Sequence, residues 1–273
     1  MSLHKGALEI LKATSRTFYI PISRLPLPLQ QAVASAYLCM RAIDEIEDHP
    51  GLNNPLKAQL LRGISLKLQA AVEDSKQEDF SVGLLKYENQ LEEVTLRIGE
   101  WILLAPETIA PRIWEATATM ADRMAYWADC NWTIKTKADL DGYTFSVAGS
   151  VGLLLSDLWA WYDGTQTNRL QAIGFGRGLQ AVNILRNHSE DIKRGVDFFP
   201  EGWEVQRMHQ YARYNLALAD AYTQALPGGP ALDFCKIPLT LAHGTLTALS
   251  IGKEKLSRSD VMSLIEKVMT VSK

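Results

Sequence analysis

Apolar residues recur at helical spacing along almost the whole chain, and this periodicity limits the fold more than any other feature. Spacings of three and four residues, typical of one face of an α-helix, run through successive segments that end at proline, glycine or polar residues. No stretch alternates apolar and polar residues as a half-buried strand would, and no short-period repeat occurs. We therefore predict an all-α bundle of about ten helices.

The predicted helices follow the breaks in this pattern. Gly142, Gly149 and Gly152 lie inside one apolar segment, a composition that permits a kink or a close approach between backbones. The expected helices cover residues 3–14, 18–22 (a short helix or turn), 29–48, 55–72, 80–104, 108–130, 139–161, 169–194, 205–226, 231–251 and 259–271.

Length and composition indicate one globular domain. The chain has 273 residues, 47% of them hydrophobic and 22% charged, which is enough apolar material for a substantial core, and we predict a single domain over residues 1–273. The net charge of -3 and the absence of a basic run give no electrostatic basis for binding nucleic acid. Cys39, Cys130 and Cys235 lack paired metal-ligand spacing, so we expect reduced core cysteines.

We expect neither a signal peptide nor a membrane anchor. No long apolar run follows the first residues, and the strongest apolar run, residues 151–155, is far shorter than the roughly 20 residues of a membrane span. The expectation is a cytoplasmic protein. Peripheral membrane contact and the oligomeric state stay open.

A ladder of oxygen-bearing side chains lies on one predicted helix. Asn183, Asn187 and Asp191 recur at i, i+4 and i+8, so they would stack along one face. Oxygen ligands suit Mg²⁺, which usually keeps waters and substrate phosphates in its shell. The ladder therefore predicts a site for Mg²⁺ and a phosphorylated substrate.

A second acidic segment, residues 44–48, ends an upstream helix. Asp44 and Asp48 share a face with Tyr37 and Arg41. Alone, such a segment is more often a solvated helix end. If it faced the ladder across a cavity, Mg²⁺ could bridge both through a diphosphate. Arg41 and Arg186 could then take up charge on that leaving group while an allylic carbocation forms in an apolar pocket.

Several segments together resemble the squalene and phytoene synthase family, the head-to-head isoprenyl diphosphate synthases, and most closely the squalene synthase style. The matching segments are residues 15–18, 37–48, 143–152, 180–186, 198–200 and 234–238, in the family's order. They extend over nearly the whole chain. The resemblance implies a single-domain isoprenoid synthase-type helical bundle with a central cavity.

The resemblance also implies roles for the matched residues. Metal and diphosphate binding would fall to Asp44, Glu47, Asp48, Asn187 and Asp191. Tyr143 matches a tyrosine proposed as an acid/base, and Arg41 and Arg186 would act on the diphosphate. The implied substrate-binding residues are Ser15, Arg16, Phe18, Tyr37, Phe145, Val147, Gln180, Asn183, Phe198 and Phe199.

Three positions depart from the family pattern. Asn187 stands where the family has Asp, which removes one anionic ligand from the second metal cluster. Ser146 replaces a frequent aromatic residue, and Val196 replaces a frequent Arg. His188 is expected to be exposed, and neither it nor His243 is a catalytic candidate. These departures bear on ion number and on the second substrate site.

The leading hypothesis is a Mg²⁺-dependent prenyltransferase that joins two farnesyl diphosphates head to head, giving presqualene diphosphate and squalene. Squalene formation would need NADPH, for which the sequence contains no glycine-rich dinucleotide fingerprint. Because of Asn187, a class I terpene cyclase or a prenyl diphosphate phosphatase acting on one prenyl diphosphate is the alternative. A further alternative is an inactive prenyl-binding partner subunit.

Overall fold

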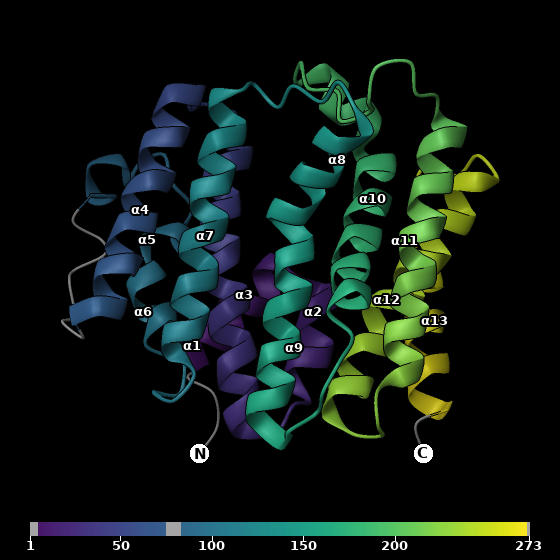
Figure 1. Cartoon of the computed structure of the whole chain (residues 1–273), viewed down its shortest axis with the longest axis horizontal. Coiled ribbons are helices and arrows are strands. Elements are labelled where there is room, and N and C mark those ends of the chain that lie inside the picture. Colours follow the sequence, from purple (N-terminus) through teal and green to yellow (C-terminus); the bar gives the residue numbers. More distant parts are fainter. Residues whose placement is uncertain (1–4, 75–82, 272–273) are drawn as a thin grey trace. The chain divides into compact units, whose positions relative to one another are not determined.

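The computed structural model describes residues 5–74 and 83–271, which form helices and connecting loops with no β-strand in either range (Figure 1). The all-α prediction is confirmed. The chain divides into two compact units, unit 1 (Met1–Asn131) and unit 2 (Trp132–Lys273). The single domain over residues 1–273 stays a prediction.

Unit 1 is built on α3 (Leu27–Asp48), whose apolar residues are buried along most of its length. Pro28 lies in its first turn, where a missing N–H breaks no helical hydrogen bond. In Figure 1, α4 (Asn54–Asp74) and α7 (Ala110–Asp129) run side by side. The other helices are α1 (Lys5–Thr14), α2 (Arg16–Ser23), η1 (Leu85–Tyr87), α5 (Glu93–Leu96) and α6 (Ile98–Ile102).

The prediction of one helix over residues 80–104 was wrong. Residues 80–82 lie outside the described part, and the rest forms the short helices η1, α5 and α6. Hydrogen bonds to α3 hold these pieces: Thr95 Oγ1 donates to the carbonyl of Ala42 at 2.9 Å, and Ser35 Oγ donates to that of Trp101 at 2.7 Å. Residues 83–104 therefore form short helices bonded to α3 rather than one continuous helix.

Unit 2 is built on α10 (Arg169–Lys193), which begins at Asn168, whose side chain accepts the N–H of Leu170 at 3.0 Å. In Figure 1, α10 and α11 (Val205–Ala225) run side by side. The other elements are α8 (Lys137–Thr144), the π-helical turn η2 (Phe145–Gly149), α9 (Ser150–Asp163), α12 (Pro230–Ser250) and α13 (Arg258–Val271).

Glycines allow the backbone of α10 to contact the backbones of η2 and α9 directly. A Cβ on Gly152 would lie 2.0 Å from the carbonyl oxygen of Ala172, and one on Gly176 would lie 2.0 Å from that of Ala148. The predicted close approach is thereby confirmed at Gly152. The single helix expected over residues 139–161 is instead α8 and α9 joined by η2.

The cysteines are free thiols, as predicted. Cys39 and Cys235 are buried, whereas Cys130 is only half-buried. Burial raises the pKa of Cys39 to about 12, so its thiol stays protonated near neutral pH. Among the described residues, no helix has both the length and the apolar character needed to cross a membrane.

Candidate functional site

Three of the predicted substrate-binding residues meet where α1, α2 and α3 pack together. Ser15 caps α2 by accepting the N–H of Phe18 at 3.1 Å, and the Phe18 ring lies 5.7 Å from the Tyr37 ring. Burial raises the pKa of Tyr37, and side-chain hydrogen bonds with Ser15 and Thr14 offset part of that rise. Arg16 belongs to α2, but its side chain lies outside the described part of the structure.

Arg41 binds two carboxylates one turn further along α3. Its Nη1 donates to Asp44 Oδ2 at 2.7 Å, and its Nη2 donates to Glu45 Oε1. Burial lowers the pKa of Arg41, but the two carboxylates outweigh burial and the pKa is raised. Arg41 is therefore a permanent cation. Glu45 was not among the predicted residues, although its i+4 spacing from Arg41 is the signal that would have revealed it.

The acidic segment of α3 has an accessible side and a buried side. Asp44 is half-buried and Asp48 is exposed, one turn apart on the same face. Glu47 is only 5% exposed, and Lys57 Nζ donates to its main-chain carbonyl at 2.6 Å. The structure thus brings Asp44 and Asp48 together and leaves Glu47 in the interior of unit 1.

On α10, polar neighbours hold each residue of the ladder. Asn183 Nδ2 lies 3.4 Å from Gln180 Oε1, and Arg186 Nε donates to Asn187 Oδ1 at 3.1 Å. Asp191 is buried, and its carboxylate accepts a charge-assisted hydrogen bond from Arg194. The ladder is therefore hydrogen-bonded along its length within unit 2.

Arg194 was missed from the sequence, although it follows Asp191 by three residues, a spacing at which helical side chains meet. It places a positive charge beside the buried Asp191 carboxylate.

In the loop after α10, two consecutive phenylalanine rings each stack on an aromatic side chain from another part of unit 2. Tyr143 lies parallel to Phe198 with ring centroids 4.6 Å apart, and His188 lies parallel to Phe199 at 4.0 Å. The expectation that His188 is exposed was wrong, since its side chain is 31% exposed and covered by Phe199. Neither periodicity nor motif spacing could reveal this pairing, because it depends on how the loop folds back.

The remaining predicted aromatic and apolar positions lie in η2. Phe145 and Val147 are half-buried, and the guanidinium carbon of Arg177 lies 5.9 Å from the Phe145 ring centroid. Ser146, one of the departures from the family pattern, is buried and donates to the carbonyl of Gly142 at 2.7 Å.

The oxygen donors of both units suit Mg²⁺. Asp44 and Asp48 in unit 1, and Asn183, Asn187 and Asp191 in unit 2, supply carboxylate and amide oxygens at one-turn spacing. In the ranges that the structure covers, no group of three or more His, Cys, Asp or Glu side chains could hold a metal by itself. Mg²⁺ commonly uses one or two carboxylates together with substrate phosphates, so the donors of each unit, taken by themselves, suit the ion.

Comparisons with known proteins agree with this all-helical architecture. The family model described as squalene/phytoene synthase matches residues 11–207. The chain is 28% identical to a squalene synthase of Eremothecium gossypii over 94% of this chain and 64% of that protein. It is 27% identical to a squalene synthase of Homo sapiens over 89% of this chain and 63% of that protein. The structure of TcSQS with the ligand E5700 superimposes with a TM-score of 0.79 at 22% identity, covering 98% of this chain and 89% of that one.

The fold and the donor residues thus define a class of protein: an all-helical protein with oxygen ligands along the faces of its helices. The chain belongs to the squalene/phytoene synthase family, whose members are transferases of this type, and it has the isoprenoid synthase helical fold. It spans less than two thirds of the length of the two curated relatives described above.

Proposed function

We propose that the protein is a Mg²⁺-dependent prenyltransferase that condenses two farnesyl diphosphates head to head to presqualene diphosphate. Family membership supports a prenyl diphosphate substrate, and the curated relatives are named squalene synthases. The observation that carries the proposal is the pair of oxygen-donor faces, Asp44 with Asp48 on α3 and the ladder on α10, each beside an arginine.

The charged residues would act on the diphosphate group. The Mg²⁺ ligands would be Asp44, Glu47 and Asp48 on α3 and Asn183, Asn187 and Asp191 on α10, and bound Mg²⁺ would stabilise negative charge on a departing diphosphate. The fixed cations would add to that stabilisation: the raised pKa of Arg41 keeps its guanidinium charged, and Arg186 lies next to Asn187 on α10.

The aromatic residues would act on the prenyl chain. Phe18 and Tyr37 in unit 1, and Tyr143 and Phe198 in unit 2, are adjoining rings that would bind apolar isoprenoid units and exclude water. Their faces would also stabilise an allylic cation without reacting with it. Tyr143 would serve as the acid/base, a role that rests on its match to the family motif.

Asn187 supports the alternative of a terpene cyclase or prenyl diphosphate phosphatase. Its side chain is neutral, and its amide oxygen already accepts a hydrogen bond from Arg186. A metal cluster with one carboxylate fewer would suffice to ionise a single prenyl diphosphate. The third candidate is a prenyl-binding subunit without turnover.

Product analysis separates these candidates. The purified chain is incubated with farnesyl diphosphate and Mg²⁺, with and without NADPH, and the products are identified by mass. We expect a C30 diphosphate without NADPH, and squalene with NADPH only if the chain also performs the reduction. A C15 hydrocarbon or alcohol as the sole product would overturn condensation in favour of the alternative.

A variant in the acidic segment tests whether the chain is itself catalytic. Asp48→Ala should abolish diphosphate release, because it removes an exposed carboxylate from the proposed metal site. Asp122→Ala, at an exposed position on α7 in the same unit, is the matched control and should release diphosphate like the parent chain. Absence of release from the parent chain with any prenyl diphosphate would instead indicate the inactive subunit.

A further inference from the structure

Asp141, in the last turn of α8, is held by bonds from three directions within unit 2. Tyr211 of α11 donates its hydroxyl to Asp141 Oδ1 at 2.9 Å, and Lys137 Nζ donates to Oδ2 at 2.6 Å. Arg177 of α10 donates Nη2 to the main-chain carbonyl of the same residue at 2.8 Å. Both the side chain and the backbone of Asp141 are therefore fixed relative to α10 and α11.

Tyr211 and Arg177 also reach the residues on either side of the junction between α8 and η2. The Tyr211 hydroxyl lies 3.0 Å from Thr144 Oγ1, on the residue that directly follows Tyr143. The Arg177 guanidinium lies over the ring of Phe145, the first residue of η2, at 5.9 Å from its centroid. Two side chains from two different helices thus hold the junction that follows Tyr143.

The junction that these side chains hold leads directly into the π-helical turn η2. π-helical turns are rare, occur mostly as single turns within α-helices, and are frequent at functional sites. The carbonyl of Ala148 in η2 lies against the backbone of Gly176 on α10, at a distance that leaves no room for a Cβ. η2 is therefore packed against α10 with no space between their backbones.

We propose that Tyr211 and Arg177 are positioning residues that hold the π-helical turn and thereby fix Tyr143 against Phe198. The structural part of this proposal stands by itself, and the part that concerns turnover rests on the proposed function. Nothing in the family resemblance assigned a role to either residue.

The two side chains suit this role chemically. Tyr211 is only 5% exposed, and burial raises its pKa, with the nearby Asp141 carboxylate adding to the rise. The phenol therefore keeps its proton near neutral pH and can donate to Asp141. Arg177 brings a planar, permanently charged group that can bond a carbonyl and cover a ring at the same time.

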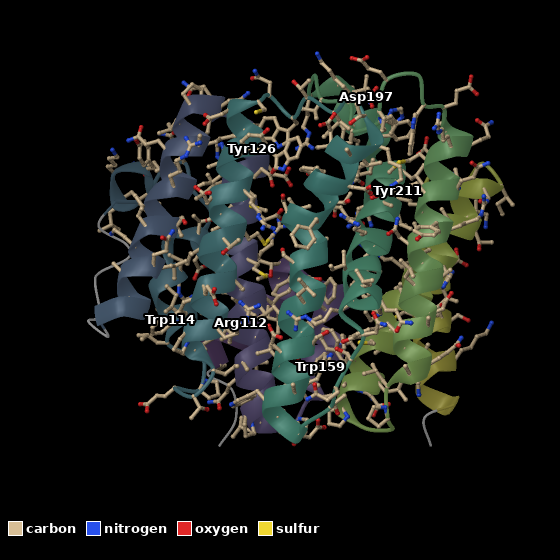
Figure 2. The ribbon with its side chains drawn as sticks, viewed as in Figure 1. Arg112, Trp114, Tyr126, Trp159, Asp197 and Tyr211 are labelled. Carbon is tan, nitrogen blue, oxygen red and sulfur yellow. The ribbon has the colours of Figure 1, made fainter. Side chains whose placement is uncertain are left out.

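A matched pair of tyrosine variants tests the structural part. Tyr211→Phe removes one buried hydroxyl from α11. Tyr222→Phe removes another from the same helix, where the Tyr222 hydroxyl lies 3.0 Å from Ser156 Oγ on α9. Trp159, one turn beyond Ser156, lies toward the opposite end of unit 2 from Asp197, whereas Tyr211 lies nearer to Asp197 (Figure 2). The two variants therefore perturb different ends of the unit.

Amide hydrogen exchange reads out the effect. In Tyr211→Phe, exchange should become about fivefold faster at residues 143–149 and 198–199, the change expected for losing one hydrogen bond, with little change at residues 152–163. Tyr222→Phe should show the reverse pattern. Equal acceleration of both segments in Tyr211→Phe, or none, would overturn the proposal without reference to any activity.

Arg177 variants and steady-state kinetics test the part that concerns turnover. With farnesyl diphosphate and Mg²⁺, Tyr211→Phe and Arg177→Leu should lower kcat about tenfold with little change in KM, because a misplaced acid/base impairs the chemical step more than binding. Arg177→Lys keeps the charge and should recover part of the loss. Faster exchange at residues 143–149 with unchanged kcat would refute the positioning role in catalysis. A parent chain without turnover would refute the proposed function and leave the exchange result to decide the structural claim.

Discussion

Asn187 places an amide between Asn183 and Asp191 on α10, and its oxygen is held by Arg186 at 3.1 Å. Replacing it with Asp would add a charged ligand at the centre of the ladder, and the adjacent guanidinium would help to keep it ionised. We expect Asn187→Asp to lower the Mg²⁺ concentration for half-maximal activity about tenfold, or to shift the products toward condensation.

Ser189→Asp is the control for this residue, because it adds the same charge two residues away at an exposed position of α10. It should leave Mg²⁺ dependence unchanged. If Asn187→Asp also leaves the Mg²⁺ dependence and the products unchanged, position 187 is not a metal ligand.

At the scale of single residues, sequence spacing predicted which side chains share a helix face better than it predicted which residues they contact. One-turn spacing correctly placed Asp44 with Asp48, since side chains four apart on a helix must share a side. It did not predict that Glu47 is buried, because that depends on how α4 packs against α3. The pairing of His188 with Phe199 was equally out of reach, since it requires the loop conformation after α10.

Among the elements, α9 and α10 approach each other closely at a glycine. A Cβ on Gly152 would lie 2.0 Å from the Ala172 carbonyl oxygen, a contact that only backbone movement could relieve. We expect Gly152→Ala to lower the free energy of unfolding by about 3 kcal/mol, measured by urea denaturation.

Gly63→Ala on α4 is expected to change the free energy of unfolding in the opposite direction. Gly63 is exposed within the helix, and a Cβ there would meet nothing within 4 Å. The substitution should raise the free energy of unfolding by about 0.5–1 kcal/mol, because alanine loses less conformational entropy in a helix. A stabilised Gly152→Ala variant would show that α9 and α10 do not approach this closely.

The start of α8 offers a pH-dependent prediction. Thr136 Oγ1 accepts the N–H of Asp139 at 3.2 Å, and Asp139 Oδ2 accepts the N–H of Thr136 at 2.8 Å, a capping box. Bonds from the backbone and side chain of Thr136 lower the pKa of Asp139. A carboxyl with a lowered pKa in the folded state stabilises the fold above its unfolded pKa, and this contribution is lost as pH falls through the folded value.

Asp139→Asn should therefore reduce stability at neutral pH, and its difference from the parent chain should shrink in acid solution below the ordinary aspartate range. Asp260→Asn provides a control with the same chemistry, because bonds from Ser257 lower the pKa of Asp260 in the first turn of α13. Both variants should follow the same trend in stability, but only Asp139→Asn should affect exchange of the α8 amides. A difference for Asp139→Asn that stays constant with pH would contradict the capping role.

At the scale of elements, periodicity predicted most helices correctly. It failed where a segment is bonded to other helices. Helices predicted over 29–48 and 108–130 agree with α3 and α7 within two residues at each end. Residues 83–104 form short pieces that are bonded to α3 through the side chain of Thr95 and the main-chain carbonyl of Trp101. The π-helical turn η2 was not predicted either, because the helical pattern of its sequence does not distinguish a π-helical turn from an α-helix; in the structure it packs against α10.

For the whole molecule, the prediction of one domain over 1–273 can be tested by the cooperativity of unfolding. The chain is held on both sides of the boundary between the units: Asn54 Nδ2 donates to Asn131 Oδ1 at 2.6 Å, and the N–H of Glu201 donates to the Lys135 carbonyl at 3.0 Å. No glycine- or proline-rich linker separates the units in sequence. We expect amides of α3 and α10 to lose protection at the same urea concentration. Two separate midpoints would show two domains.

Ligand-linked stability tests whether both units serve one substrate. A ligand that binds only the folded chain stabilises it by about 2.7 kcal/mol at 100 times its Kd, which for a chain of this size corresponds to a rise in Tm of about 5 °C. We expect farnesyl thiodiphosphate with Mg²⁺ to give such a rise, and Mg²⁺ alone to give little. Asp48→Ala in unit 1 and Asp191→Ala in unit 2 should each reduce it, whereas Asp122→Ala should not. If only one of the two variants weakens the stabilisation, the other acidic element does not bind the diphosphate, and the proposed division of ligands between α3 and α10 is wrong.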